Sequence, residues 1–265
     1  MKTMLIIEIA GMFLIPLLAV LIPIFIGQRY GIYRSKNQEE LQHTPVGAVV
    51  GAAFGLLAFM LAFTFQIVAN RYDARKELLL DEVTNIRTTY LRAGLIPEPM
   101  RTETRKQLVE YVDLRIQLAS DASKLGLTMT RSQQVLDSFW NYSEKLGELD
   151  RSSENYALFI SSVNDLVDNY NQRITMAIEY RIPVAILWVL FIIAFLSMLA
   201  LGYQFGISGK GSFRINLLLA VVFAVVMFLI LSLDRPETGM AKMNQKPMFT
   251  LQHQLQVMQF NGGKQ

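Results

Sequence analysis

The 265-residue sequence contains no cysteine and only two histidines, His43 and His253. The missing cysteine excludes disulfides, thiolate zinc sites and cysteine nucleophiles. Both histidines lie in polar, loop-like stretches. The sequence therefore has few residues for histidine-based acid–base catalysis or for a metal site with several histidines. The sequence also has no phosphate-binding loop, nucleophile–base pair or metal-ligand cluster. We therefore expect no enzyme activity, no metal site and no cofactor.

Charged residues are scarce, at 18% of the chain, against about a quarter in an ordinary soluble domain. The formal net charge of +3 is too small to indicate a nucleic-acid partner. Hydrophobic residues reach 52%, and the mean hydropathy is positive. These values together predict a membrane protein, with the lipid bilayer as its surroundings.

Four stretches are long and apolar enough to cross a hydrocarbon core about 30 Å thick as helices. They cover residues 5–27, 45–69, 182–206 and 215–233. Inside a bilayer only a helix satisfies the backbone polar groups of such a segment, so we expect four transmembrane helices. The first stretch is too long for a cleaved signal peptide, and no small-residue cleavage pattern follows it. It carries one charge, Glu8, for which we expect a structural role.

The lysine and arginine residues near the ends of these spans predict the orientation. Nine lie on one face: Lys2, Arg71, Arg75, Lys76, Arg173, Arg181, Arg235, Lys242 and Lys246. Five lie on the other: Arg29, Arg34, Lys36, Lys210 and Arg214. Because cytoplasmic loops carry more basic residues, we expect both termini and the long middle segment in the cytoplasm.

The middle segment, 70–181, has helical periodicity throughout, as at Leu79, Val83, Ile86 and Tyr90. Such apolar stripes need partner surfaces, so we expect about four helices packed as a bundle, with no strand. The predicted fold is an all-α, polytopic membrane protein with a cytoplasmic helical bundle. Its expected parts are two membrane helices in 1–69, the bundle in 70–181, two membrane helices in 182–234, and a flexible, amide-rich cytoplasmic tail in 235–265.

One face of the second span has a regular pattern of residue types. Gly47, Gly51 and Gly55 repeat every four residues, and Phe59 and Phe63 continue the same spacing. Polar and then basic residues follow, namely Thr64, Gln66, Asn70, Arg71, Arg75 and Lys76. A pore with a hydrophobic constriction would have such a face, because rings of phenylalanine gate by dewetting. The pattern is equally typical of glycines at helix contacts and phenylalanines that face lipid.

Three runs favour the pore interpretation: GLLAFMLAFTF at 55–65, NRYDARK at 70–76 and DEVTNIRTTYLRA at 81–93. They resemble the bacterial bestrophin-like family and, more distantly, the bestrophin chloride channels. Four spans with a helical segment after the second also fit that family, so the resemblance covers most of the chain. It implies that Phe59 and Phe63 match the neck positions of those channels, and that Arg71 and Tyr72 match an Arg–aromatic pair. Gly55 stands where bestrophins have a further apolar neck residue.

The resemblance also implies a place in the bacterial inner (plasma) membrane. The acidic cluster that clasps calcium in bestrophins has no counterpart here, and the cytoplasmic segment is much smaller. On the helix that leaves the second span we expect Asp81, Glu82, Asn85 and Arg87 to pair between subunits.

We therefore predict a homo-oligomeric ion channel, a tetramer or a pentamer, that selects anions, with chloride as the expected permeant ion. The predicted pore-lining residues are Gly51, Gly55, Phe59, Phe63, Gln66 and Asn70. The predicted vestibule charges are Arg71, Arg75 and Lys76. The alternative is a non-conducting membrane scaffold or sensor whose bundle binds a partner. A secondary transporter is disfavoured because no internal repeat is visible.

Overall fold

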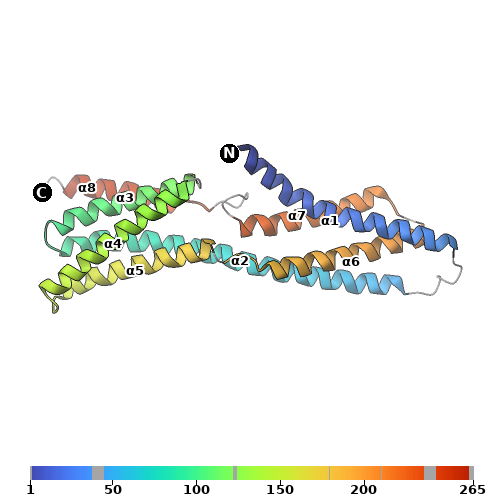
Figure 1. The fold of residues 1–265 in the computed structure, drawn as a ribbon, viewed down its shortest axis with the longest axis horizontal. Coiled ribbons are helices and arrows are strands. Elements are labelled where there is room, and N and C mark those ends of the chain that lie inside the picture. The colour runs from blue at the N-terminus through green and yellow to red at the C-terminus, as the bar shows by residue number, and fades with distance from the viewer. Residues whose placement is uncertain are drawn as a thin grey trace. The chain divides into compact units, whose positions relative to one another are not determined.

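The computed structural model describes residues 2–37, 45–121, 124–178, 180–209, 211–235 and 243–262. His43, Lys210 and Lys242, which entered the predictions above, lie outside these residues. Over the described ranges the chain is helical apart from short connections, and it contains no strand (Figure 1). This confirms the predicted all-α fold class. The elements, in order, are α1 (Lys2–Asn37), α2 (Val46–Arg92), η2 (Ala93–Leu95), α3 (Met100–Ser120), α4 (Leu125–Leu149), α5 (Glu154–Ile178), α6 (Val184–Ser208), α7 (Phe213–Asp234) and α8 (Lys246–Gly262).

The chain divides into two compact units. One consists of Met1–Tyr72 and Arg181–Lys242 and is called the membrane unit here; the other consists of Asp73–Tyr180 and Met243–Gln265 and is called the bundle. The first part of α2 belongs to the membrane unit and the rest to the bundle. Within the described ranges, four helices are long and apolar enough to span a membrane, and each overlaps one of the four predicted stretches.

Helices α1 and α6 of the membrane unit pack with their backbones almost in contact. A Cβ atom added to Gly27 on α1 would lie 2.1 Å from the carbonyl oxygen of Leu199, and one added to Gly202 on α6 would lie 2.1 Å from that of Ile24. Both separations are far below van der Waals contact. Glycine at these positions therefore permits a closeness that favours association of helices in a membrane.

We expect Gly202→Ala to destabilise the membrane unit by about 1–3 kcal/mol, because the added methyl group must push the backbones of α1 and α6 apart. The midpoint of thermal unfolding in detergent measures this effect. Gly11→Ala is the matched control, since a Cβ atom at Gly11 has nothing within 4 Å. An equal fall in Tm for both variants would contradict the close packing of α1 on α6.

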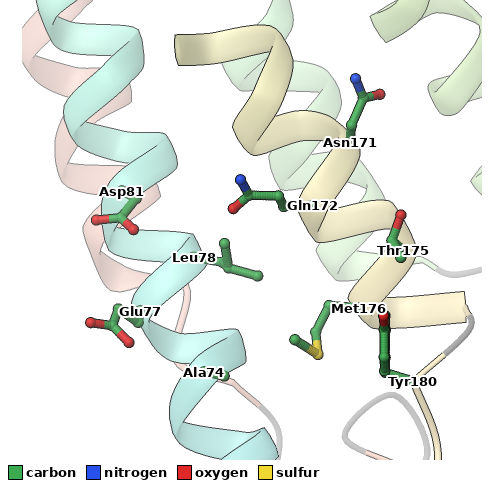
Figure 2. Close-up of a pocket in the computed structure, with 9 residues that line it drawn as sticks. All are labelled: Ala74, Glu77, Leu78, Asp81, Asn171, Gln172, Thr175, Met176 and Tyr180. Carbon is green, nitrogen blue, oxygen red and sulfur yellow. The ribbon is translucent and has the colours of Figure 1, made fainter.

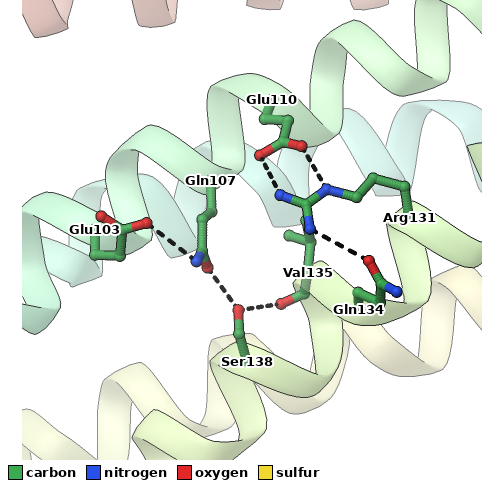
Figure 3. Close-up of polar contacts among 7 residues, drawn as sticks. All are labelled: Glu103, Gln107, Glu110, Arg131, Gln134, Val135 and Ser138. Atoms are coloured by element: carbon green, nitrogen blue, oxygen red, sulfur yellow. Dashed lines mark hydrogen bonds and ion pairs between the residues drawn. The ribbon is translucent and has the colours of Figure 1, made fainter.

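The bundle contains the second part of α2 with α3, α4 and α5, the four helices that the periodicity predicts, and also α8. Its core holds large, fully buried side chains that come from different helices, among them Leu79, Tyr111, Phe139 and Leu166. Helices α3 and α4 are also joined at their surface. There Glu110 accepts two hydrogen bonds from Arg131, of 2.6 and 3.0 Å (Figure 3).

The expectation of a flexible tail is wrong for residues 246–262, which form α8. Met248, Leu251 and Leu255 are buried in the bundle core, and Gln252 donates a 2.6 Å hydrogen bond to Asp113 on α3. The three apolar residues are spaced three and four positions apart and form one face of a helix. The sequence analysis missed this apolar stripe because it is short and lies within a stretch rich in amide side chains.

Candidate functional site

Helix α2 is the least covered of the four candidate spans. Only 11% of its most apolar window is buried within the chain, against 28%, 22% and 39% for the spans in α1, α6 and α7. A membrane helix with so little internal contact presents most of its surface to lipid, to another subunit or to water. The candidate site is therefore the exposed surface of α2.

The six residues predicted to line a pore are all exposed. Their steps of three or four positions keep them within about 120° of the helix circumference. They thus form one continuous surface, called the α2 stripe here: Gly51, Gly55, Phe59, Phe63, Gln66 and Asn70.

The phenylalanines of the α2 stripe are largely exposed. Phe59 is 65% and Phe63 52% exposed, and their rings stack on each other with centroids 6.4 Å apart and planes inclined by 12°. The glycines before them serve no contact within the chain, because Cβ atoms at Gly51 and Gly55 would have nothing within 4 Å. This half of the α2 stripe is therefore a smooth, narrow surface that ends in two aromatic rings.

The other end of the α2 stripe is polar. Gln66 donates a 2.6 Å hydrogen bond from its side chain to the side-chain oxygen of Asn70, and both residues are exposed. Thr64 differs, because it is buried and its hydroxyl donates to the carbonyl oxygen of Met60 at 2.7 Å. One internal hydrogen bond leaves further amide donors and acceptors on Gln66 and Asn70. The Gln66 amide lies inside the predicted span, where a polar group is costly unless it meets water or protein.

The three predicted vestibule charges differ in their surroundings. Arg71 is partly buried in the membrane unit, with its guanidinium 4.0 Å from the carboxylate of Asp234, which also accepts the backbone N–H of Ile182 at 3.0 Å. Arg75 is buried in the bundle and donates to the carbonyl oxygen of Tyr180 at 3.3 Å. Lys76 is exposed. The sequence analysis did not single out Asp234 and missed its contact with Arg71.

Glu82 was expected to pair between subunits, and the structure corrects this. Its side chain is fully buried inside the bundle, where it pairs with Arg115 and Arg173 and accepts a 2.8 Å hydrogen bond from the hydroxyl of Tyr111. Burial lowers the pKa of Arg173 to about 10 and raises that of Tyr111 to about 12. Glu82 therefore holds α2, α3 and α5 together within one chain.

A hollow of about 620 Å³ lies between α2 and α5 in the bundle (Figure 2). Leu78 and Met176 point into the gap between the helices, whereas the carboxylates of Glu77 and Asp81 point away from α5. Among the residues that the structure describes, no group of three or more acidic or histidine side chains could hold a metal ion. We assign no ligand to this hollow.

The chain matches the bestrophin-like domain over residues 13–248. Its fold is similar to the crystal structure of a bacterial bestrophin homolog from Klebsiella pneumoniae in a single-substitution variant, with a TM-score of 0.66 and 16% identity, covering 93% of this chain and 98% of the homolog. A second crystal structure of a Klebsiella bestrophin homolog gives a TM-score of 0.64 and 14% identity, covering 91% and 97%. No match was found among the curated proteins.

The domain match extends over most of the sequence and includes most of α1 and the other three membrane helices. The expected resemblance is thereby confirmed, and it supports a membrane protein of the ion-channel type. The chain belongs to the bestrophin-like family.

Proposed function

We propose that this protein is a homo-oligomeric ion channel in which the α2 stripe lines the central pore. The observation that carries the proposal is the exposed face of α2, on which the largely exposed Phe59 and Phe63 rings are followed by Gln66, inside the predicted span, and by its partner Asn70 at the end of that span. Lipid is a poor environment for the Gln66 amide, whereas a water-filled pore satisfies it. The ion-channel character of the family agrees with this assignment.

Phe59 and Phe63 are the proposed constriction. Four residues of helix separate them by about 6 Å along its axis. In a tetramer or a pentamer they would form two successive aromatic rings around the pore. Apolar rings of this kind resist wetting when narrow and so control ion flow. The open surface at Gly51 and Gly55 would form a wider entrance above them.

Anion selectivity, with chloride as the permeant ion, is the first candidate, and it rests on the resemblance to bestrophin chloride channels. The contacts of α2 give a specific reason for a second candidate, a cation-selective pore. Arg71 and Arg75 both contact groups of their own unit, whereas Asp73, Glu77 and Asp81 are exposed on α2 after its membrane part. Acidic side chains near a pore favour cations.

Recordings from the purified protein in lipid bilayers, under a potassium chloride gradient, test both proposals. We expect Phe59→Ala and Phe63→Ala each to raise the single-channel conductance or alter rectification, because each removes one ring of the constriction. The reversal potential of the unmodified chain decides the ion: a value near that of chloride supports the first candidate, and one near that of potassium the second.

The scaffold alternative predicts a different result. Silence from the unmodified chain and both variants in several lipid compositions would favour a non-conducting protein whose bundle binds a partner. Conductance that neither substitution changes would keep the channel but remove Phe59 and Phe63 from its pore. Phe65→Ala is the matched control, because Phe65 is a 40% exposed phenylalanine of the same helix that lies outside the α2 stripe.

A further inference from the structure

A groove of about 590 Å³ lies between α1 and α6 in the membrane unit. Its lining comes equally from the two helices: Ile26, Gly27, Tyr30 and Arg34 of α1, and Leu196, Leu199, Ala200 and Tyr203 of α6. The backbones approach closely at Gly27 and Leu199, and the small side chain of Ala200 leaves space beside them. A groove of this volume is large enough for a drug-sized ligand.

The groove has an apolar end and a polar end. Gly27 lies against Leu199 and Gly31 against Tyr203, so α1 and α6 run in the same direction. Ile26 and Leu196 therefore share one end, while Arg34 lies about 12 Å further along α1, in its last turn. A phospholipid has the same change of polarity along its length, from an apolar acyl chain to a charged phosphate.

The polar end has the chemistry of a membrane boundary. Tyr30 and Tyr203 stack with ring centroids 5.7 Å apart, and tyrosine is enriched where hydrocarbon meets headgroups. The Arg34 guanidinium has five N–H donors, so it can bind a phosphate while it keeps the contact that it makes within the chain. None of the eight lining residues is acidic.

We propose that this groove binds one anionic phospholipid, with the phosphate at Arg34 and an acyl chain along Ile26, Leu196 and Ala200. The membrane-spanning character of α1 and α6 makes lipid the molecule that meets their exposed surface. The positive charge of Arg34 favours a headgroup of net negative charge, and a guanidinium binds phosphate through charge-assisted hydrogen bonds. The proposal does not depend on conduction, because its test measures bound lipid and no current.

Native mass spectrometry of the delipidated protein in detergent tests the site, with phosphatidylglycerol and phosphatidylcholine of identical acyl chains as probes. We expect phosphatidylglycerol to bind about fivefold more tightly, as one arginine near the headgroups would provide. Arg34→Gln should abolish this preference. Ala200→Phe should weaken the binding of both lipids, because its ring fills the groove.

Arg29→Gln is the matched control, because Arg29 is an exposed arginine of α1 that does not line the groove, and it should keep the preference. A preference that survives Arg34→Gln, or lipid binding that Ala200→Phe leaves unchanged, would overturn the proposal. A change of oligomer size in Ala200→Phe, with neither added lipid binding to the unmodified protein, would assign the groove to a second copy of the chain instead. Thermal unfolding of each variant verifies that it is folded.

Discussion

Replacing Glu82 by alanine is expected to destabilise the bundle by about 3–5 kcal/mol, because it leaves two buried arginines without their counter-charge. The Glu82 side chain has no exposed surface, and those of its partners Arg115 and Arg173 are only 9% and 15% exposed. The loss should come from the desolvated charges that remain, since a buried ion pair contributes little against an apolar replacement of the same volume.

Fluorescence of Trp140 measures this loss during denaturant unfolding in detergent. The chain has two tryptophans, and Trp188 lies in the membrane unit, so Trp188→Phe leaves Trp140 as the reporter of the bundle. The matched control is Asp81→Ala, which removes an exposed carboxylate from the neighbouring position and should cost less than about 0.5 kcal/mol.

A combined variant separates the charge effect from the packing effect. Glu82→Leu with Arg115→Met and Arg173→Met removes all three charges, and we expect it to recover most of the stability that Glu82→Ala loses. If this variant is as unstable as Glu82→Ala, the hydrogen bond from Tyr111 and the packing of the side chains matter more than charge balance. If Asp81→Ala and Glu82→Ala lose equal stability, the buried carboxylate of Glu82 contributes no more to the stability of the bundle than an exposed one does.

The membrane helices could be predicted from the sequence because hydropathy over some twenty residues is a local property. The α2 stripe could also be predicted, since spacing along a single helix fixes which residues share a face. Whether that face lines a pore depends on neighbouring subunits, so the pore assignments of Phe59 and Phe63 stay predictions.

Contacts between distant parts of the sequence account for what prediction missed. Glu82 lies on the apolar face of α2, three positions after Leu79 and four before Ile86, and this spacing signals burial. Its partners, however, come from α3 and α5, and no local pattern identifies them. The pairing of Arg71 with Asp234 likewise joins residues that are far apart in the sequence. The sequence shows these residue types but not which partner each one meets.

A cysteine at position 63 should make the ion selectivity of the channel switchable by charge. The chain has no native cysteine, so Phe63→Cys provides a single thiol, and Phe63 is 52% exposed on the α2 stripe. A thiol in a water-filled pore forms the reactive thiolate, whereas one in lipid does not. Charged methanethiosulfonate reagents can then add either sign of charge after the protein has folded.

We expect the cationic and anionic adducts of Phe63→Cys to shift the reversal potential in opposite directions. One unit charge at about 6 Å from an ion changes its energy by about 0.7 kcal/mol even at the dielectric constant of water, and each subunit adds another. The chloride-to-potassium permeability ratio of the two adducts should therefore differ by at least about tenfold. This expectation holds whichever ion the unmodified channel prefers.

Two controls make the result specific to the α2 stripe. The unmodified chain should not respond to either reagent, and Ile192→Cys, on the 53% exposed surface of α6, should not respond either if that surface faces lipid. Opposite shifts at position 63 alone would establish that α2 lines the pore at its constriction. Equal loss of current with both reagents, at an unchanged reversal potential, would show that a charge at this position blocks the channel without governing its selectivity. The ion would then be selected elsewhere, and the exposed carboxylates of Asp73, Glu77 and Asp81 would be the next groups to neutralise.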